Sequence, residues 1–299
     1  MISDSRPIDP ARVAAATAAH GLDPRQSAEV RVLIPTGYGL NCEAETAAAF
    51  ALLGARVEQR HVGDLLAAPE QLHDFDVLAF IGGFSFGDHV ASGRVYANRL
   101  RFRLGDDLAR FVADRGLVIG MCNGFQVLVK LGLLPGPIAQ RGDAGDRLAP
   151  QRASVIVNER IGYRDSWVRL VHEPETACVW LSGIDRLECP ARHGEGRLVF
   201  ADAELEAQLA AAGQICLRYV DAQGRPTQRW PDNPNGSPGG AAALCDESGR
   251  VFGLMPHPEA FLYAENHPRW IARREAGESP AFGEGLRLFA NGLRAALSR

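Results

Sequence analysis

Strand-like and helix-like stretches alternate along the first half of the chain. Four runs predict strands, three of them continuously apolar: residues 30–35, 55–62, 76–81 and 117–121. Three further stretches predict helices: residues 42–53, 96–114 and 125–134. This order predicts an α/β domain whose mostly parallel sheet is flanked by helices.

The second half has a different pattern. Residues 150–200 alternate short β-like runs with polar turns, and residues 230–240 form a loop rich in Pro, Asn and Gly. One more apolar strand is expected at 251–255, and an amphipathic helix ends the chain. We therefore expect β-rich insertions in the second half of the same domain.

The first residues are set apart from this pattern. Asp9-Pro10 and Gly21 bracket an alanine-rich stretch, which is helix punctuation. We expect residues 1–29 to form an N-terminal helical extension and residues 30–299 to form one domain.

Composition narrows the function classes. A net charge of −4 and a pI of about 6.1 provide no electrostatic reason to bind nucleic acid or an anionic membrane. There is no apolar run of bilayer length and no signal-peptide pattern at the start, so a cytoplasmic location is expected. The six cysteines are scattered without a CxxC pair, which predicts reduced thiols and no zinc ribbon. Without a Gly-Lys-Ser/Thr sequence there is no P-loop, so any ATP would bind another chain.

The sequence GMCNG places Cys122 between an apolar strand and a helix. This is the cysteine form of the G-x-S-x-G nucleophile elbow, in which the tight turn exposes the side chain above the sheet edge. The helix N-terminus favours the thiolate, and the N–H of Asn123 can help to hold an oxyanion. The alternative is a small buried cysteine at a strand end.

A cysteine nucleophile needs a base and a group that orients the base. His257 and Glu259 follow the strand at 251–255, so they should share the rim of the parallel sheet with Cys122. A surface turn with a chance histidine is the alternative, and His193 is the main rival base. Gly82 and Gly83 follow the third strand, where their N–H groups could face a substrate or simply form a tight turn.

Six motifs follow one another along the chain: GGFSFGD (82–88), GMCNGFQ (120–126), LGLLPG (131–136), HGEGR (193–197), NPNGSP (233–238) and MPHPE (255–259). Over residues 30–299 the chain resembles the class I glutamine amidotransferases, and in particular the glutaminase part of phosphoribosylformylglycinamidine synthase. The resemblance implies a flavodoxin-like class I glutaminase fold and a role in purine biosynthesis.

The resemblance also implies roles for single residues. Cys122 matches the nucleophile that forms a γ-glutamyl thioester, and His257 and Glu259 match its catalytic partners. Gly82, Gly83, Asn123 and Gln126 match oxyanion or glutamine-binding positions. No metal or cofactor is expected in this chain. ATP and Mg²⁺ are expected on a synthetase subunit, which receives the ammonia, and a small accessory subunit could complete the complex.

Three residues depart from the family pattern: Phe125 replaces a second cysteine, Phe86 a tyrosine and Ala260 an arginine. Three rival functions stay open. The chain could be a glutaminase for another synthetase, a catalytically silent docking subunit, or a peptidase or γ-glutamyl hydrolase on a similar fold.

Overall fold

A computed structural model describes residues 8–136, 148–278 and 280–298. The main sheet contains nine strands: β1 (Arg31–Thr36), β2 (Arg56–His61), β3 (Val77–Phe80), β4 (Leu117–Met121), β6 (Arg164–His172), β7 (Arg186–His193), β9 (Leu217–Tyr219), β10 (Ala241–Cys245) and β11 (Val251–Leu254). Their order across the sheet is β2-β1-β3-β4-β11-β10-β9-β6-β7. A two-stranded sheet pairs β5 (Ala153–Ile156) with β8 (Arg197–Phe200).

The main sheet has a parallel half and an antiparallel half. Strands β2, β1, β3, β4 and β11 pair in parallel, as the alternation of strands and helices predicts. Strands β10, β9, β6 and β7 continue the sheet with antiparallel pairing. The second-half strands are therefore largely an extension of the main sheet, and only β5 and β8 form a sheet of their own.

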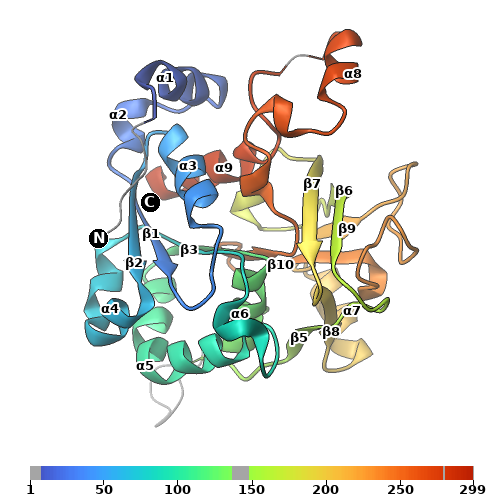
Figure 1. Cartoon of the computed structure of the whole chain (residues 1–299). Helices are drawn as coiled ribbons and strands as arrows, with labels where there is room; N and C mark the ends of the chain where they lie inside the picture. The colour runs from blue at the N-terminus through green and yellow to red at the C-terminus, as the bar shows by residue number, and fades with distance from the viewer. Residues whose placement is uncertain (1–7, 137–147, 279, 299) are drawn as a thin grey trace.

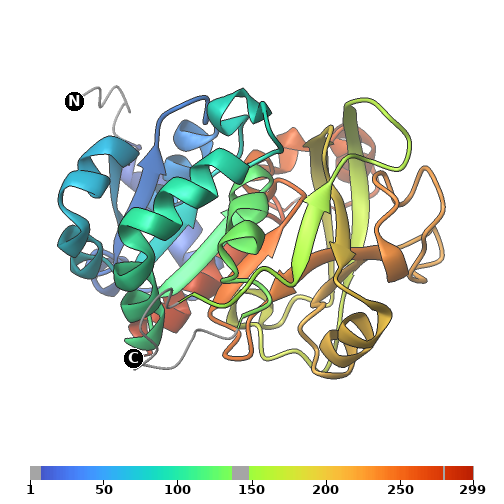
Figure 2. The ribbon, with the colours of Figure 1, turned by 90° about the horizontal axis from the view of Figure 1, so that it is seen from below.

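Helices cover both faces of the parallel half (Figure 1). One layer contains α1 (Pro10–Ala19), α2 (Pro24–Ser27), α3 (Glu43–Leu52) and α9 (Leu286–Leu297). The opposite layer contains α4 (Val62–Ala67), α5 (Arg94–Ala113) and α6 (Asn123–Leu131), which lie in front of the sheet in Figure 2. The two remaining helices are α7 (Ala203–Ala211), which packs against β8, and α8 (Trp270–Glu275) near the end of the chain.

The core is divided by the sheet because successive strand residues point to opposite faces. In β1, Val32 and Ile34 belong to the cluster under α3 and α9, whereas Leu33 belongs to the cluster under α5 and α6. Such strands are buried on both faces, which explains why they appear in the sequence as continuous apolar runs.

Some boundaries and helices differ from the sequence-based expectation. The helix expected over 125–134 ends at Leu131, because Gly132 adopts a left-handed conformation (φ 79°) that stops it. Helices α4, α7 and α8 were not predicted. The two six-residue helices, α4 and α8, are too short to show a clear period.

The N-terminal helix is capped and docked. The Asp9 side chain accepts a hydrogen bond from the N–H of Ala11 (2.9 Å), and Pro10 is the first helical residue. An Arg294 guanidinium donates to the carbonyl of His20 (2.7 Å) and ties the end of α1 to α9. Residues 1–7 of the expected extension lie outside the described residues. Within the described ranges, no helix is long and apolar enough to cross a membrane.

Candidate active site

Cys122 occupies the turn between β4 and α6, where the chain changes from strand to helix. Its backbone has φ 51° and ψ −108°, a conformation that residues with a side chain rarely adopt. Such strain costs about 1–3 kcal/mol and tends to occur at functional sites. The residue is 7% exposed, and its Sγ donates to the carbonyl of Arg192 over 3.6 Å. The turn has the strained geometry expected of a nucleophile elbow.

The glycines on either side of Cys122 are required by close packing. A Cβ at Gly124 would lie 2.0 Å from the carbonyl oxygen of Phe80, and a Cβ at Gly120 would lie 2.6 Å from a methyl carbon of Leu128. Both distances are far below van der Waals contact. The absence of side chains therefore lets α6 start directly against β3 and β4 and holds Cys122 at the sheet edge.

His257 and Glu259 reach the same edge from the neighbouring strand. Strands β4 and β11 pair in parallel with Met121 opposite Leu254, so both chains leave the sheet at one rim, as predicted. The Nδ1–H of His257 donates to a carboxylate oxygen of Glu259 over 2.6 Å, and both side chains are almost fully buried. A buried carboxylate bonded to one ring nitrogen orients the imidazole and leaves Nε2 for chemistry.

The charge of this pair is set by opposing effects. Burial disfavours the imidazolium, but the Glu259 carboxylate and the Cys122 sulfur outweigh it, so the pKa of His257 is raised well above its usual value. His257 Nε2 is buried and has no hydrogen-bond partner among the described residues, so it is available for chemistry. An imidazolium held in this position stabilises a thiolate beside it.

A second thiol belongs to this group and was not anticipated from the sequence. Cys42 Sγ lies within 4.8 Å of ligand atoms of both His257 and Glu259. A Cβ added at Gly82 would lie 2.9 Å from Cys42 Sγ, 3.0 Å from His257 Cε1 and 3.5 Å from Cys122 Cβ. Gly82 thus lies at the centre of the cluster, where any side chain would fill the space between these groups. Burial raises the pKa of the Cys42 thiol. A raised pKa favours the protonated thiol, which is less reactive than the thiolate.

Gly83 is held in a conformation that favours glycine. Its φ is 134°, and a Cβ there would lie 2.7 Å from the carbonyl oxygen of Gly39. Two hydrogen bonds flank it, from Asn41 N–H to the Gly82 carbonyl and from Phe84 N–H to the Gly39 carbonyl. Neither bond uses the N–H of Gly83. The N–H of Asn123 is in the first turn of α6, where backbone donors have no partner within the helix. Both predicted oxyanion donors are thus left out of the regular backbone pairing.

The side chain of Gln126 joins α6 to the HGEGR turn. Its Nε2 donates to the carbonyl of Glu195 (2.5 Å), and its Oε1 accepts from Asn123 Nδ2 (2.9 Å). The turn is also held by Asn158, whose amide donates to the His193 carbonyl and accepts from Gly196 N–H. Gln126 therefore positions the segment beside Cys122, and its predicted contact with bound glutamine stays a prediction.

His193, the rival base, is in a less suitable environment. It is 2% exposed, and neither ring nitrogen has a hydrogen-bond partner in the described part of the chain. Burial and the positive charge of His257 lower the pKa of His193 to about 3. Without a carboxylate to orient it, His193 lacks the arrangement that His257 has, and the geometry favours His257.

Two of the unusual residues and one motif have structural explanations. Phe125 is fully buried, and its ring occupies the space beside Gly253, where a Cβ would be 2.3 Å away. Phe86 stacks on Tyr38 with ring centres 4.4 Å apart. In the NPNGSP motif, the Ser237 hydroxyl accepts from the N–H of Leu198 (3.0 Å), so this motif anchors β8. Nothing in the structure explains Ala260.

This fold and site geometry fit the class expected from the sequence, the glutamine amidotransferases. Residues 29–294 match the family described as a CobB/CobQ-like glutamine amidotransferase domain, so the chain belongs to this family. The predicted class is confirmed, and the chain is a glutamine amidotransferase.

Curated relatives define the subgroup more closely. The chain is similar to the phosphoribosylformylglycinamidine synthase subunit PurQ of Dehalococcoides mccartyi, with 40% identity over 266 residues, covering 89% of this chain and 97% of that protein. It is 39% identical over 270 residues to the subunit PurQ of Methanococcus maripaludis, covering 88% and 96%. A chain in the structure of PurLQS from Thermotoga maritima has the same fold, with a TM-score of 0.63 and 24% identity over 89% of this chain and 98% of that one.

Proposed function

We propose that this chain is the glutaminase subunit of phosphoribosylformylglycinamidine synthase. It would hydrolyse glutamine and supply ammonia to a synthetase subunit in purine biosynthesis. One observation carries the assignment as a glutaminase: Cys122, His257 and Glu259 lie at the same rim of the sheet. A 2.6 Å hydrogen bond joins His257 to Glu259. The role in purine biosynthesis is supported by the relatives, because the similarity to this chain extends over almost their full length.

The reaction follows from the geometry. The Cys122 thiolate attacks the side-chain amide carbon of glutamine and forms a tetrahedral intermediate. The N–H groups of Gly83 and Asn123 would hold the negative oxygen. The imidazolium of His257 gives a proton to the departing nitrogen, so ammonia leaves and a γ-glutamyl thioester remains. His257, now neutral, takes a proton from water, whose attack on the thioester releases glutamate and restores the thiolate.

Glu259 has a positioning role in this scheme. It holds the Nδ1–H of His257, keeps Nε2 directed at the reacting atoms, and stabilises the imidazolium before ammonia leaves. Its own carboxylate is buried beside the imidazole, where solvent does not weaken the interaction. It need not touch the substrate to affect the rate.

The remaining chemistry belongs to partners. We propose that ATP and Mg²⁺ bind the synthetase subunit, where formylglycinamide ribonucleotide is activated and ammonia converts its amide to the amidine. A small accessory subunit would complete the assembly, and the complex would work in the cytoplasm. The name PurLQS given to the Thermotoga maritima structure supports an assembly of this kind.

The proposal is tested by glutamate release with and without the synthetase subunit, ATP and formylglycinamide ribonucleotide. Wild type should release glutamate in the full mixture, and Cys122→Ala should not. Cys189→Ala is a matched control, because Cys189 is also buried but lies in β7 and is not one of the three residues to which the reaction assigns a step. Glutamate release that continues in Cys122→Ala would refute the nucleophile. Release by wild type that needs a different synthetase would refute the pathway alone.

A further inference from the structure

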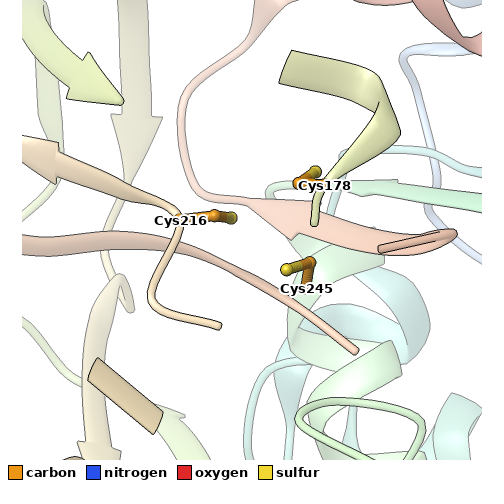
Figure 3. Close-up of side chains that lie close together, drawn as sticks. All are labelled: Cys178, Cys216 and Cys245. Atoms are coloured by element: carbon orange, nitrogen blue, oxygen red, sulfur yellow. The ribbon is translucent and has the colours of Figure 1, made fainter. Parts of the chain in front are cut away.

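Three other cysteines lie together in the antiparallel half of the sheet (Figure 3). Cys178 precedes the short 3-10 turn η3 (Val179–Leu181), Cys216 precedes β9, and Cys245 is the last residue of β10. Their Sγ atoms all lie within 4.8 Å of one another. None of the three residues is more than 4% exposed. Three segments far apart in the sequence thus place three thiols in one buried position.

This thiol cluster is separate from the glutaminase site. Strand β10 is antiparallel to β11, and Cys245 is opposite Phe252, near the start of β11. Cys122 follows β4, which pairs with the other side of β11, and lies beyond the far end of β11, where Met121 is opposite Leu254. The two sites therefore lie at opposite ends of β11, and the cluster takes no part in the reaction of Cys122.

The backbone around each thiol is already fixed. The N–H of Cys245 donates to the Gln214 carbonyl (2.9 Å), and the carbonyl of Cys216 accepts from Glu173 N–H (3.1 Å). The N–H of Cys178 donates to the hydroxyl of Thr176 (3.2 Å). Sites built on fixed backbone bind with little loss of conformational entropy.

The spacing of the sulfur atoms suits a metal ion. At the usual Zn–S distance of about 2.3 Å, two thiolate sulfurs in a tetrahedral site lie about 3.8 Å apart. The three sulfur atoms here lie within 4.8 Å of one another, which agrees with that spacing. Thr176 Oγ1 lies 3.4 Å from Cys245 Sγ, close to the roughly 3.5 Å between sulfur and oxygen ligands of one tetrahedral ion. Thiolate ligands select soft or borderline ions such as Zn²⁺.

We propose that Cys178, Cys216 and Cys245 form a structural zinc site, with the hydroxyl of Thr176 beside them as the fourth group. Binding replaces three thiol protons with one Zn²⁺, so three protons are released and three Zn–S bonds form. The ion would link the turn before β7 to β9 and β10 and stabilise the antiparallel half of the sheet.

The first test is zinc binding by the full-length chain, reduced and freed of metal by a chelator. Zinc is added back in competition with a chromophoric chelator. We expect one Zn²⁺ per chain with a dissociation constant below about 1 μM and a higher melting temperature with zinc. The triple variant Cys178→Ser/Cys216→Ser/Cys245→Ser should bind at least 100-fold more weakly. A wild-type chain that folds but binds no zinc would overturn the proposal.

Two controls separate this site from other thiols. Cys189→Ser removes an equally buried cysteine that is not part of the thiol cluster and should leave zinc binding unchanged. Cys42→Ser tests the other group of possible ligands, Cys42 with His257 and Glu259, and should also leave it unchanged. Loss of binding in Cys42→Ser would place the ion at the glutaminase site and refute the proposal.

A further measurement does not depend on the triple variant folding. Cobalt(II) replaces zinc in such sites, and thiolate ligands produce a near-ultraviolet charge-transfer band whose intensity rises with their number. Wild-type protein should show the intensity of three thiolates. A band of one thiolate, or none, would contradict the assigned ligand set.

Discussion

The backbone N–H of Cys122 donates to the carbonyl of Leu254 over 2.9 Å, so the proposed nucleophile is attached to the strand that leads to the proposed base. His257 follows Leu254 by only three residues, after the chain has left β11. A slip of one residue between β4 and β11 would move Cys122 and His257 apart and turn their side chains to the wrong faces. The register of this strand pair therefore sets the geometry of the site.

Replacing Glu259 with Gln tests the positioning role. The amide keeps the size of the carboxylate but removes its charge and favours the wrong histidine tautomer. We expect kcat to fall by about 10²–10⁴-fold, while KM changes only a few-fold because Glu259 lies behind His257. Steady-state glutamine hydrolysis with the synthetase partner measures both constants. A large rise in KM with unchanged kcat would mean that Glu259 acts on glutamine binding instead.

The raised pKa of His257 predicts how stability depends on pH. Its folded-state pKa lies above the unfolded value of about 6.5, so the interaction with Glu259 stabilises the fold fully below that pH. The contribution is lost as pH rises through the folded-state pKa. Urea unfolding of wild type and His257→Gln from pH 6 to 9 should show a stability difference that is largest at pH 6. A difference that grows with pH would contradict the assigned charge state.

Replacing Gly124 with Ala tests the packing of the elbow. The new methyl group would lie 2.0 Å from the carbonyl oxygen of Phe80, so α6 must shift away from β3. We expect a loss of about 1–3 kcal/mol in unfolding free energy and the loss of most glutaminase activity. Gly194→Ala is the control, because a Cβ there meets nothing within 4 Å. Equal stability of the two variants in urea unfolding would show that the close contact is not a constraint.

The parallel half of the fold was predictable because it has a simple period. Its strands are buried on both faces, and glycines mark where the chain turns, as at Gly54 after α3. Cys122, His257 and Glu259 could be placed together because parallel strands end at one rim. The antiparallel strands were expected only as insertions, because their pairing with β11 depends on contacts that no local pattern contains.

The positions that sequence reasoning missed are held by long-range contacts. Cys42 precedes α3, and its contact with His257 crosses the site through Gly82, which has no side chain to keep them apart. The sequence around Cys42 contains neither a nucleophile motif nor residues spaced like metal ligands. The cluster of Cys178, Cys216 and Cys245 likewise joins separate segments, and scattered cysteines in a sequence do not reveal such a meeting.

The two thiols of the active site should differ in reactivity, which gives the last test. Cys122 is at the N-terminus of α6, whereas burial raises the pKa of the Cys42 thiol. An electrophilic analogue of glutamine should therefore label Cys122 alone, as identified by peptide mass spectrometry. Cys42→Ala should keep glutamine hydrolysis within about tenfold of wild type, because the variant removes packing beside His257 but no reacting atom. Two results would instead make Cys42 the nucleophile and overturn the assignment of the elbow. One is labelling of Cys42 in wild-type protein, and the other is a Cys42→Ala variant whose activity falls to the level of Cys122→Ala.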